Sequence, residues 1–130
     1  MNRKYFSLLG TAASLLGPSL PAVAQDHYPN RPIRMVVPYT PGGITDVVTR
    51  IYAQELAKAF NTNMLVDNRP GANSILGAEI VARASADGYT LLAVIAAHAA
   101  NQTLYPKLPY DSIKSFAPVS LLATTPGSAG

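Results

Sequence analysis

Val36-Val37-Pro38-Tyr39-Thr40-Pro41-Gly42-Gly43-Ile44-Thr45-Asp46 is the stretch that decides the fold of this chain. A short apolar run ends at two glycines and an amphipathic helical pattern follows, which predicts a strand, a turn and a helix start. Because glycine has no Cβ, Gly42 and Gly43 permit a sharp turn and close approach of a ligand to the main chain. Free N–H groups at a helix start, together with the helix dipole, favour a carboxylate, phosphate or sulfate. The stretch therefore predicts an anion-binding turn.

The segments on either side of this turn continue the same pattern. The β-branched run from Ile33 to Tyr39 is typical of a parallel strand that is buried on both faces. The following helix is expected to be capped by Gly43 or Thr45, with Asp46 in the first turn, where the dipole favours an acid. One face of this helix is apolar and is expected to face the core. Its members are Ile44, Val47, Val48, Ile51, Tyr52, Leu56 and Phe60.

Further along the chain, strand and helix patterns alternate. A second strand is expected from Met64 to Val66, a second helix from Ser74 to about Ser85, and a third strand from Tyr89 to Ala96. The segment from Ala117 to Ala123 is a candidate fourth strand. Within the second helix we expect the inward side chains to be Ile75, Leu76, Ile80, Val81 and Ala84. This alternation predicts an α/β fold with a mainly parallel sheet and right-handed crossovers.

The first residues have the three parts of an export signal. Arg3 and Lys4 form a basic region, an apolar stretch follows, and Ala22-Val23-Ala24 provides a cleavage site. Residues 1–24 are therefore interpreted as a signal peptide, with cleavage after Ala24 and a periplasmic mature chain. No later segment reads as long and apolar enough to span a bilayer, so no transmembrane segment is expected in the mature chain.

Composition excludes several classes of function. The whole chain has a formal net charge of +3, and removal of the two basic signal residues leaves a mature charge of +1. The sequence has no cluster of lysine and arginine, so it lacks the basic patch that binding to a nucleic acid requires. The absence of cysteine excludes disulfides and thiolate metal sites, and two histidines cannot form a histidine-rich site. We therefore expect no metal and no cofactor.

Many short motifs, in a fixed order from residue 28 to about residue 125, resemble one protein family. They begin with Tyr28-Pro29 and Arg31-Pro32-Ile33-Arg34 and continue through the glycine turn. The later ones are Asp67-Asn68-Arg69-Pro70-Gly71-Ala72, Gly77-Ala78-Glu79, Ala82-Arg83-Ala84, Asp87-Gly88-Tyr89-Thr90-Leu91-Leu92, Leu104-Tyr105-Pro106-Lys107-Leu108-Pro109-Tyr110-Asp111 and Phe116-Ala117-Pro118-Val119-Ser120-Leu121. In this order they resemble the periplasmic solute receptors of tripartite tricarboxylate transporters, also called the Bug family.

The resemblance implies a fold and a function. The fold is the two-lobed, hinge-closing architecture of type II periplasmic binding proteins. The function is non-enzymatic: the receptor holds a small carboxylate in its cleft and hands it to a membrane permease pair. In such a receptor, the turn after the first strand and the loop after the third, about Ala96 to Asn101, edge the ligand cleft. The implied ligand-binding residues are Tyr39, Pro41, Gly42, Gly43, Thr45, Asp46, Ala97 and His98.

Two departures from the family pattern affect this interpretation. Asn73 and Ser74 stand where the family usually has further glycines, which puts backbone contacts from that loop in question. A two-lobed receptor also needs two domains of roughly 100–150 residues each. We therefore interpret residues 25–130 as a partial first lobe, a fragment or prematurely terminated copy, without the second lobe. Such a piece is expected to expose sheet edges and apolar faces, to aggregate and to bind weakly or not at all.

The individual site residues have plainer interpretations beside the functional ones. The two glycines could form a turn without a ligand, and the helix dipole alone accounts for Asp46, which could otherwise be a general base. His98 could bind a carboxylate or simply be exposed in a loop, the more common case. Arg69 could bind an anion or pair with Asp67, and we favour the structural role. Tyr39 could face the ligand or fill the cleft wall, and its place at a strand end favours the ligand.

A second class of function is a small exported α/β hydrolase that acts on an anionic substrate. Such an esterase needs a Gly-x-Ser-x-Gly nucleophile elbow with histidine and aspartate partners, and this motif is absent from the sequence. Neither the Walker phosphate loop nor the dinucleotide Gly-x-Gly-x-x-Gly motif is present. The receptor is therefore the preferred interpretation.

Overall fold

The computed structural model describes residues 27–124, so the expected signal peptide at residues 1–24 lies outside the described part. Six elements follow one another along the chain: β1 (Ile33–Val37), α1 (Ile44–Phe60), β2 (Met64–Asn68), α2 (Ile75–Ala82), β3 (Thr90–Leu92) and α3 (Ala97–Leu104). Among residues 27–124, no helix has both the length and the apolar character needed to cross a membrane.

The three strands form a parallel sheet in the order β2-β1-β3. β1 pairs with β2 from Ile33 opposite Met64 to Val37 opposite Asn68, and with β3 around Met35 opposite Leu91. Ile33, Val36 and Val37 in the central strand are almost completely buried. The parallel α/β arrangement predicted from the alternating pattern is confirmed.

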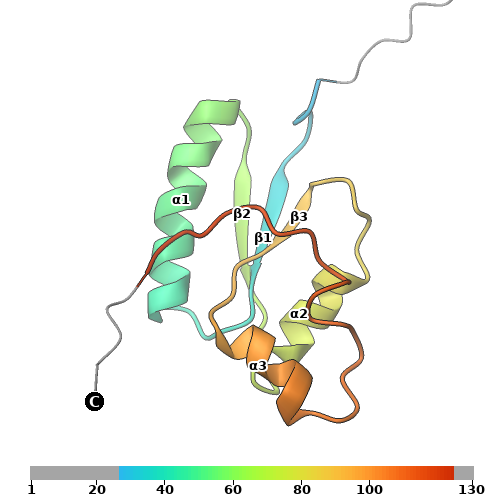
Figure 1. Ribbon diagram of the computed structural model, residues 1–130. Coiled ribbons are helices and arrows are strands. Elements are labelled where there is room, and N and C mark those ends of the chain that lie inside the picture. The colour runs from blue at the N-terminus through green and yellow to red at the C-terminus, as the bar shows by residue number, and fades with distance from the viewer. Residues whose placement is uncertain (1–26, 125–130) are drawn as a thin grey trace, which may run out of the picture.

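Helices flank the sheet on two sides (Figure 1). α1 packs against β2 and β1, whereas α2 packs against β3 and β1. The central strand is therefore covered from both sides, which explains why its sequence is an almost unbroken apolar run. All three strands end at the same edge of the sheet, where the chain turns into each helix.

The face of α1 that contacts the sheet differs from the expected apolar face. Asp46, Thr49 and Ala53 are the buried residues of this helix. The expected inward residues are mostly exposed, at 69% for Ile44 and 57% for Ile51, and Val47, Tyr52 and Phe60 are exposed as well. These small and polar side chains can face the sheet because their polar groups are paired: Asp46 accepts from Gly42 in the turn and from Asn68 at the end of β2, and the Thr49 hydroxyl donates to the carbonyl oxygen of Thr45 within α1. Most of the apolar face is thus exposed within the described residues.

The later elements are shorter than the sequence pattern suggested. α2 ends at Ala82 and buries Gly77 and Ala78, while the expected inward residues Leu76 and Ile80 are exposed. β3 ends at Leu92. The backbone N–H of Ala93 still donates to the carbonyl oxygen of Val36, but the next donor along β1 would be Pro38, which has no N–H.

Two further differences concern the C-terminal part of the described chain. α3 was not predicted, because its alanine-rich sequence lacks a clear apolar stripe. The expected fourth strand is irregular between Ala117 and Ala123. This segment runs back across the strands towards α1 (Figure 1), where the Tyr52 hydroxyl donates a hydrogen bond of 2.6 Å to the carbonyl oxygen of Leu122. Within residues 27–124, this side-chain contact stands in place of the backbone ladder that a strand needs.

Gly77 allows α2 to approach the ends of β1 and β2 closely. A Cβ at this position would lie 2.6 Å from Cβ of Pro38 and 2.9 Å from the carbonyl oxygen of Arg69. Neither neighbour is the mobile end of a long side chain, so the helix itself would have to shift.

We expect Gly77→Ala to lower the free energy of unfolding by about 1–2 kcal/mol, because overpacking outweighs the gain in helix propensity. Urea denaturation followed by circular dichroism measures this change. Ala100→Ser, an addition on the exposed side of α3, is the control and should change stability by no more than about 0.5 kcal/mol. A neutral or stabilising Gly77→Ala would show that α2 does not need this close approach.

Candidate anion-binding site

The turn between β1 and α1 has the geometry that the sequence predicted. Gly42 has a φ of +82°, in the left-handed region that glycine enters without strain. Gly43 is the N-cap residue of α1, and no side chain caps the helix. Pro41, Gly42 and Gly43 are all exposed. The start of α1 is therefore open at the carboxyl edge of the sheet.

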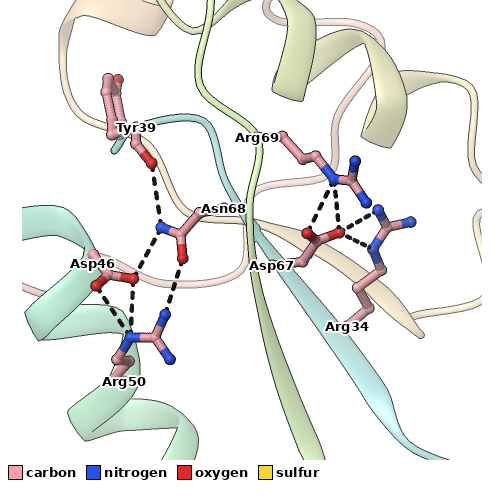
Figure 2. A network of polar contacts seen from close by, with 7 residues as sticks. All are labelled: Arg34, Tyr39, Asp46, Arg50, Asp67, Asn68 and Arg69. Atoms are coloured by element: carbon pink, nitrogen blue, oxygen red, sulfur yellow. Dashed lines mark hydrogen bonds and ion pairs between the residues drawn. The ribbon is translucent and has the colours of Figure 1, made fainter. Parts of the chain in front are cut away.

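The Asp46 carboxylate lies behind this turn and holds it in place. The carboxylate accepts a hydrogen bond of 2.9 Å from the backbone N–H of Gly42. Asn68 donates to its other oxygen at 2.9 Å, and Arg50 forms an ion pair with it at 3.0 Å (Figure 2). Asp46 is only 3% exposed. The turn thus already binds one carboxylate from the chain itself, through an N–H that precedes the helix.

These contacts determine the chemistry of Asp46. The hydrogen bond from Arg50, followed by those from Gly42 and Asn68, outweighs desolvation and lowers the pKa of Asp46 from 3.8 to about 2. A carboxylate with this pKa is a weak base, and both of its oxygens are already hydrogen-bonded. Its geometry is suited to a structural anion rather than to the general base considered from the sequence.

Three donors remain at the first turn of α1. The first backbone bond of the helix runs from the N–H of Val47 to the carbonyl oxygen of Gly43. Within the described residues, the backbone N–H groups of Ile44, Thr45 and Asp46 have no acceptor. Unpaired N–H groups at the positive end of a 17-residue helix favour a bound anion.

The end of β2 connects the turn to the rest of the sheet. Successive strand residues point to opposite faces, so Asn68 faces α1 while Asp67 faces away from it (Figure 2). The Asn68 side chain donates to the carbonyl oxygen of Tyr39 at 3.2 Å as well as to Asp46, and it accepts from Arg50 at 2.9 Å. Asn68 therefore joins β1, β2 and α1 at the carboxyl edge.

Asp67 organises a second polar cluster on the opposite face. Arg34 and Arg69 both donate to its carboxylate, Arg69 from Nε at 3.0 Å (Figure 2). Burial raises the pKa of Asp67, but the hydrogen bonds from the two guanidinium groups outweigh it and lower the pKa overall. The structural role of Arg69, favoured from the sequence, is confirmed by this contact.

Tyr39 and Thr45 lie beside the turn with half-buried side chains. The Tyr39 hydroxyl is buried and has no hydrogen-bond partner in the described part of the chain. The carbonyl oxygen of Thr45 accepts a 2.6 Å hydrogen bond from the hydroxyl of Thr49 within α1. Both residues therefore support the edge of the site from inside the fold.

Ala97 and His98 are placed on α3 rather than in a loop. His98 is buried, stacks on Tyr110 with a ring-centroid distance of 5.7 Å, and meets the edge of Phe116 at 5.0 Å. Burial lowers the pKa of His98, which favours the neutral ring. The expectation of an exposed loop histidine was wrong, because the aromatic side chains of residues 110 and 116 fold over α3.

Two residues that complete the site, Arg50 and Asn68, were absent from the sequence-based list. The spacing of Asp46 and Arg50 by four residues on one helix is a recognisable ion-pair signal. Asn68 gave no comparable signal, because its partners come from segments 22 and 29 residues away. Its role depends on the parallel pairing of β1 and β2.

The fold and the open turn at the carboxyl edge of the sheet are those of an α/β ligand-binding protein. A helix N-terminus at the carboxyl edge of a parallel sheet is where α/β proteins bind their ligands. The chain belongs to the tripartite tricarboxylate transporter family of receptors, whose family model matches residues 48–128.

Individual relatives agree with this assignment. Protein BugT of Bordetella pertussis is 37% identical over 125 residues, which cover 95% of this chain and 38% of BugT. Among solved structures, MatC from Rhodopseudomonas palustris with bound malate has a TM-score of 0.69 and 41% identity, over 73% of this chain and 33% of that one. An R. palustris protein with adipate has a TM-score of 0.62 and 36% identity, over 65% and 29% of the two chains. The chain thus spans about a third of the length of these relatives.

We expect the Asp46 cluster to make stability depend on acid. Folding lowers the pKa of Asp46, so the ionised carboxylate contributes to the free energy of unfolding. This contribution is complete above about pH 4 and is lost as the pH falls from about 4 to about 2. Asp46→Asn should lower the free energy of unfolding at pH 7. It should also flatten the acid limb, the fall of this free energy between about pH 4 and pH 2, in urea titrations at several pH values.

Glu55→Gln, which removes an exposed carboxylate that pairs with Lys58, is the matched control. It should leave the acid limb almost unchanged. An unaltered limb in Asp46→Asn would mean that the acid sensitivity comes from other carboxylates, such as Asp67.

Proposed function

We propose that this chain is the ligand-binding part of a periplasmic receptor that holds a small carboxylate and delivers it to the permease subunits of a tripartite tricarboxylate transporter. The single observation that carries the proposal is the open first turn of α1, with the backbone N–H groups of Ile44, Thr45 and Asp46 unpaired. Membership of the receptor family and relatives with bound malate and adipate support it.

In this proposal the turn binds one carboxylate group of the ligand. The N–H groups donate to the carboxylate oxygens, and the helix dipole adds electrostatic stabilisation. The buried Asp46 carboxylate does not compete for the same donors, since it accepts from Gly42. Its role is to hold the turn rigid, so that little conformational entropy is lost on binding.

The remaining members of the proposed site act at different distances from the ligand. Pro41, Gly42 and Gly43 form the exposed rim, and Thr45 supplies a donor. Tyr39, in the segment after β1, and Ala97, at the start of α3, support the edge. His98 acts indirectly, because its ring is buried against Tyr110 and Phe116.

The proposal also assigns residues 25–130 to a partial first lobe, preceded by the signal peptide. A second lobe would close over the ligand and supply further contacts. A single lobe covers only one side of a small ligand, so we expect this chain to bind in the millimolar range.

An NMR titration with malate tests the proposal at this affinity. We expect the largest shifts at the amides of Ile44, Thr45 and Asp46, and much smaller shifts with malamide, which lacks the charge. Ile44→Pro removes one donor at a helix position that tolerates proline, and it should weaken malate binding about tenfold. Ile44→Ala has the same exposed position but keeps the donor, so it should bind like the natural chain.

Several outcomes would contradict the proposal. Equal shifts with malate and malamide, or equal affinities for the proline and alanine variants, would exclude charge recognition by this turn. Turnover of an anionic substrate that Asp46→Asn abolishes would support the hydrolase instead.

A further inference from the structure

The loop between β2 and α2 has an unusual backbone. Gly71, Ala72, Asn73 and Ser74 are consecutive and all have positive φ, at 140°, 46°, 49° and 72°. Side-chain-bearing residues rarely adopt this left-handed conformation, because Cβ crowds the following carbonyl oxygen. Three of them in succession persist only where the surrounding structure imposes the conformation.

Asn101 is the residue that contacts this loop from α3. Its side chain is completely buried. Its Nδ2 donates to the carbonyl oxygen of Asn73 at 2.8 Å and to the hydroxyl of Ser74 at 3.2 Å. Its Oδ1 accepts from Nδ2 of Asn73, also at 2.8 Å. One amide therefore makes three hydrogen bonds to the last two residues of the loop.

We propose that Asn101 is a positioning residue that holds the loop from Gly71 to Ser74 in its left-handed conformation. The connections that follow β2 and β3 are thereby fixed to each other at the carboxyl edge of the sheet. A primary amide suits this task because it donates and accepts at the same time. Only the consequence for the ligand, a fixed spacing of two loops at the cleft edge, rests on the proposed function.

The hydrogen bonds of Asn101 hold a loop conformation that glycine adopts more readily than the residues present. The sequence has alanine and serine at positions 72 and 74, which have no intrinsic preference for positive φ, and only Asn73 between them is a residue type that adopts it more readily. The loop in turn supports the start of α2 through backbone bonds from Ile75 to Ala72 and from Ala78 to Ser74. These two amides report directly on the loop.

Amide hydrogen exchange measured by NMR on the whole chain tests the proposal without any ligand. Asn101→Leu keeps a similar shape, adds no charge and removes all three hydrogen bonds. We expect exchange at Ile75 and Ala78 to become about tenfold faster. The amides of Arg69 and Ala93, which bond within the sheet, should keep their natural rates.

A glycine rescue separates positioning from packing. Ala72→Gly makes no change to the hydrogen bonds of Asn101 but allows positive φ without strain. In the Asn101→Leu background it should restore most of the protection at Ile75. Ala86→Gly, an exposed position outside the left-handed loop, is the matched control and should restore none.

If Asn101→Leu does not fold, Asn73→Ala provides the same test at an exposed side chain. It removes one of the three bonds and should accelerate exchange at Ile75 about threefold. Uniform acceleration throughout the sheet, no acceleration, or equal rescue by both glycine variants would overturn the proposal. Because none of these readouts involves malate, their failure would leave the carboxylate proposal standing.

Discussion

The Asp46 carboxylate is the contact on which the carboxyl edge of this fold depends. It joins the backbone of the glycine turn, the guanidinium of Arg50 one helical turn further on, and the amide of Asn68 at the end of β2. A buried carboxylate is stable only when its oxygens are paired. Its burial therefore requires the turn, α1 and β2 to occupy these relative positions, and this requirement leaves the helix start open towards solvent.

The alternation of side chains along β2 extends this constraint to both faces of the sheet. Asn68 belongs to the Asp46 cluster, whereas the neighbouring Asp67 pairs with Arg34 and Arg69 on the other face. A one-residue shift in register would exchange the two clusters and leave both carboxylates without their partners. Polar contacts thus specify the register at a strand whose own apolar pattern is weak.

Local chemistry explains which predictions were confirmed. The parallel sheet and the glycine turn follow from neighbouring residues and were predicted, and Gly43 is one of the two residues expected to cap the helix. The expected orientation of α1 was wrong, because the apolar stripe of the helix does not reveal the hydrogen bonds from Gly42 and Asn68 that hold Asp46 against the end of the sheet. The burial of His98 was missed for a similar reason, since Tyr110 and Phe116 reach it from a later segment.

The sequence by itself determined the order of strand, turn and helix, the sharp turn at Gly42 and Gly43, and the family to which the chain belongs. These properties depend on residues close together in the chain and on their order. Only the tertiary structure decided which donors of the turn are free, because Asp46 occupies one of them while its own position depends on Asn68. The conformation of the loop before α2 was decided in the same way, by a side chain from α3. In both cases the partners are distant in sequence, and only the parallel pairing of the strands brings them together.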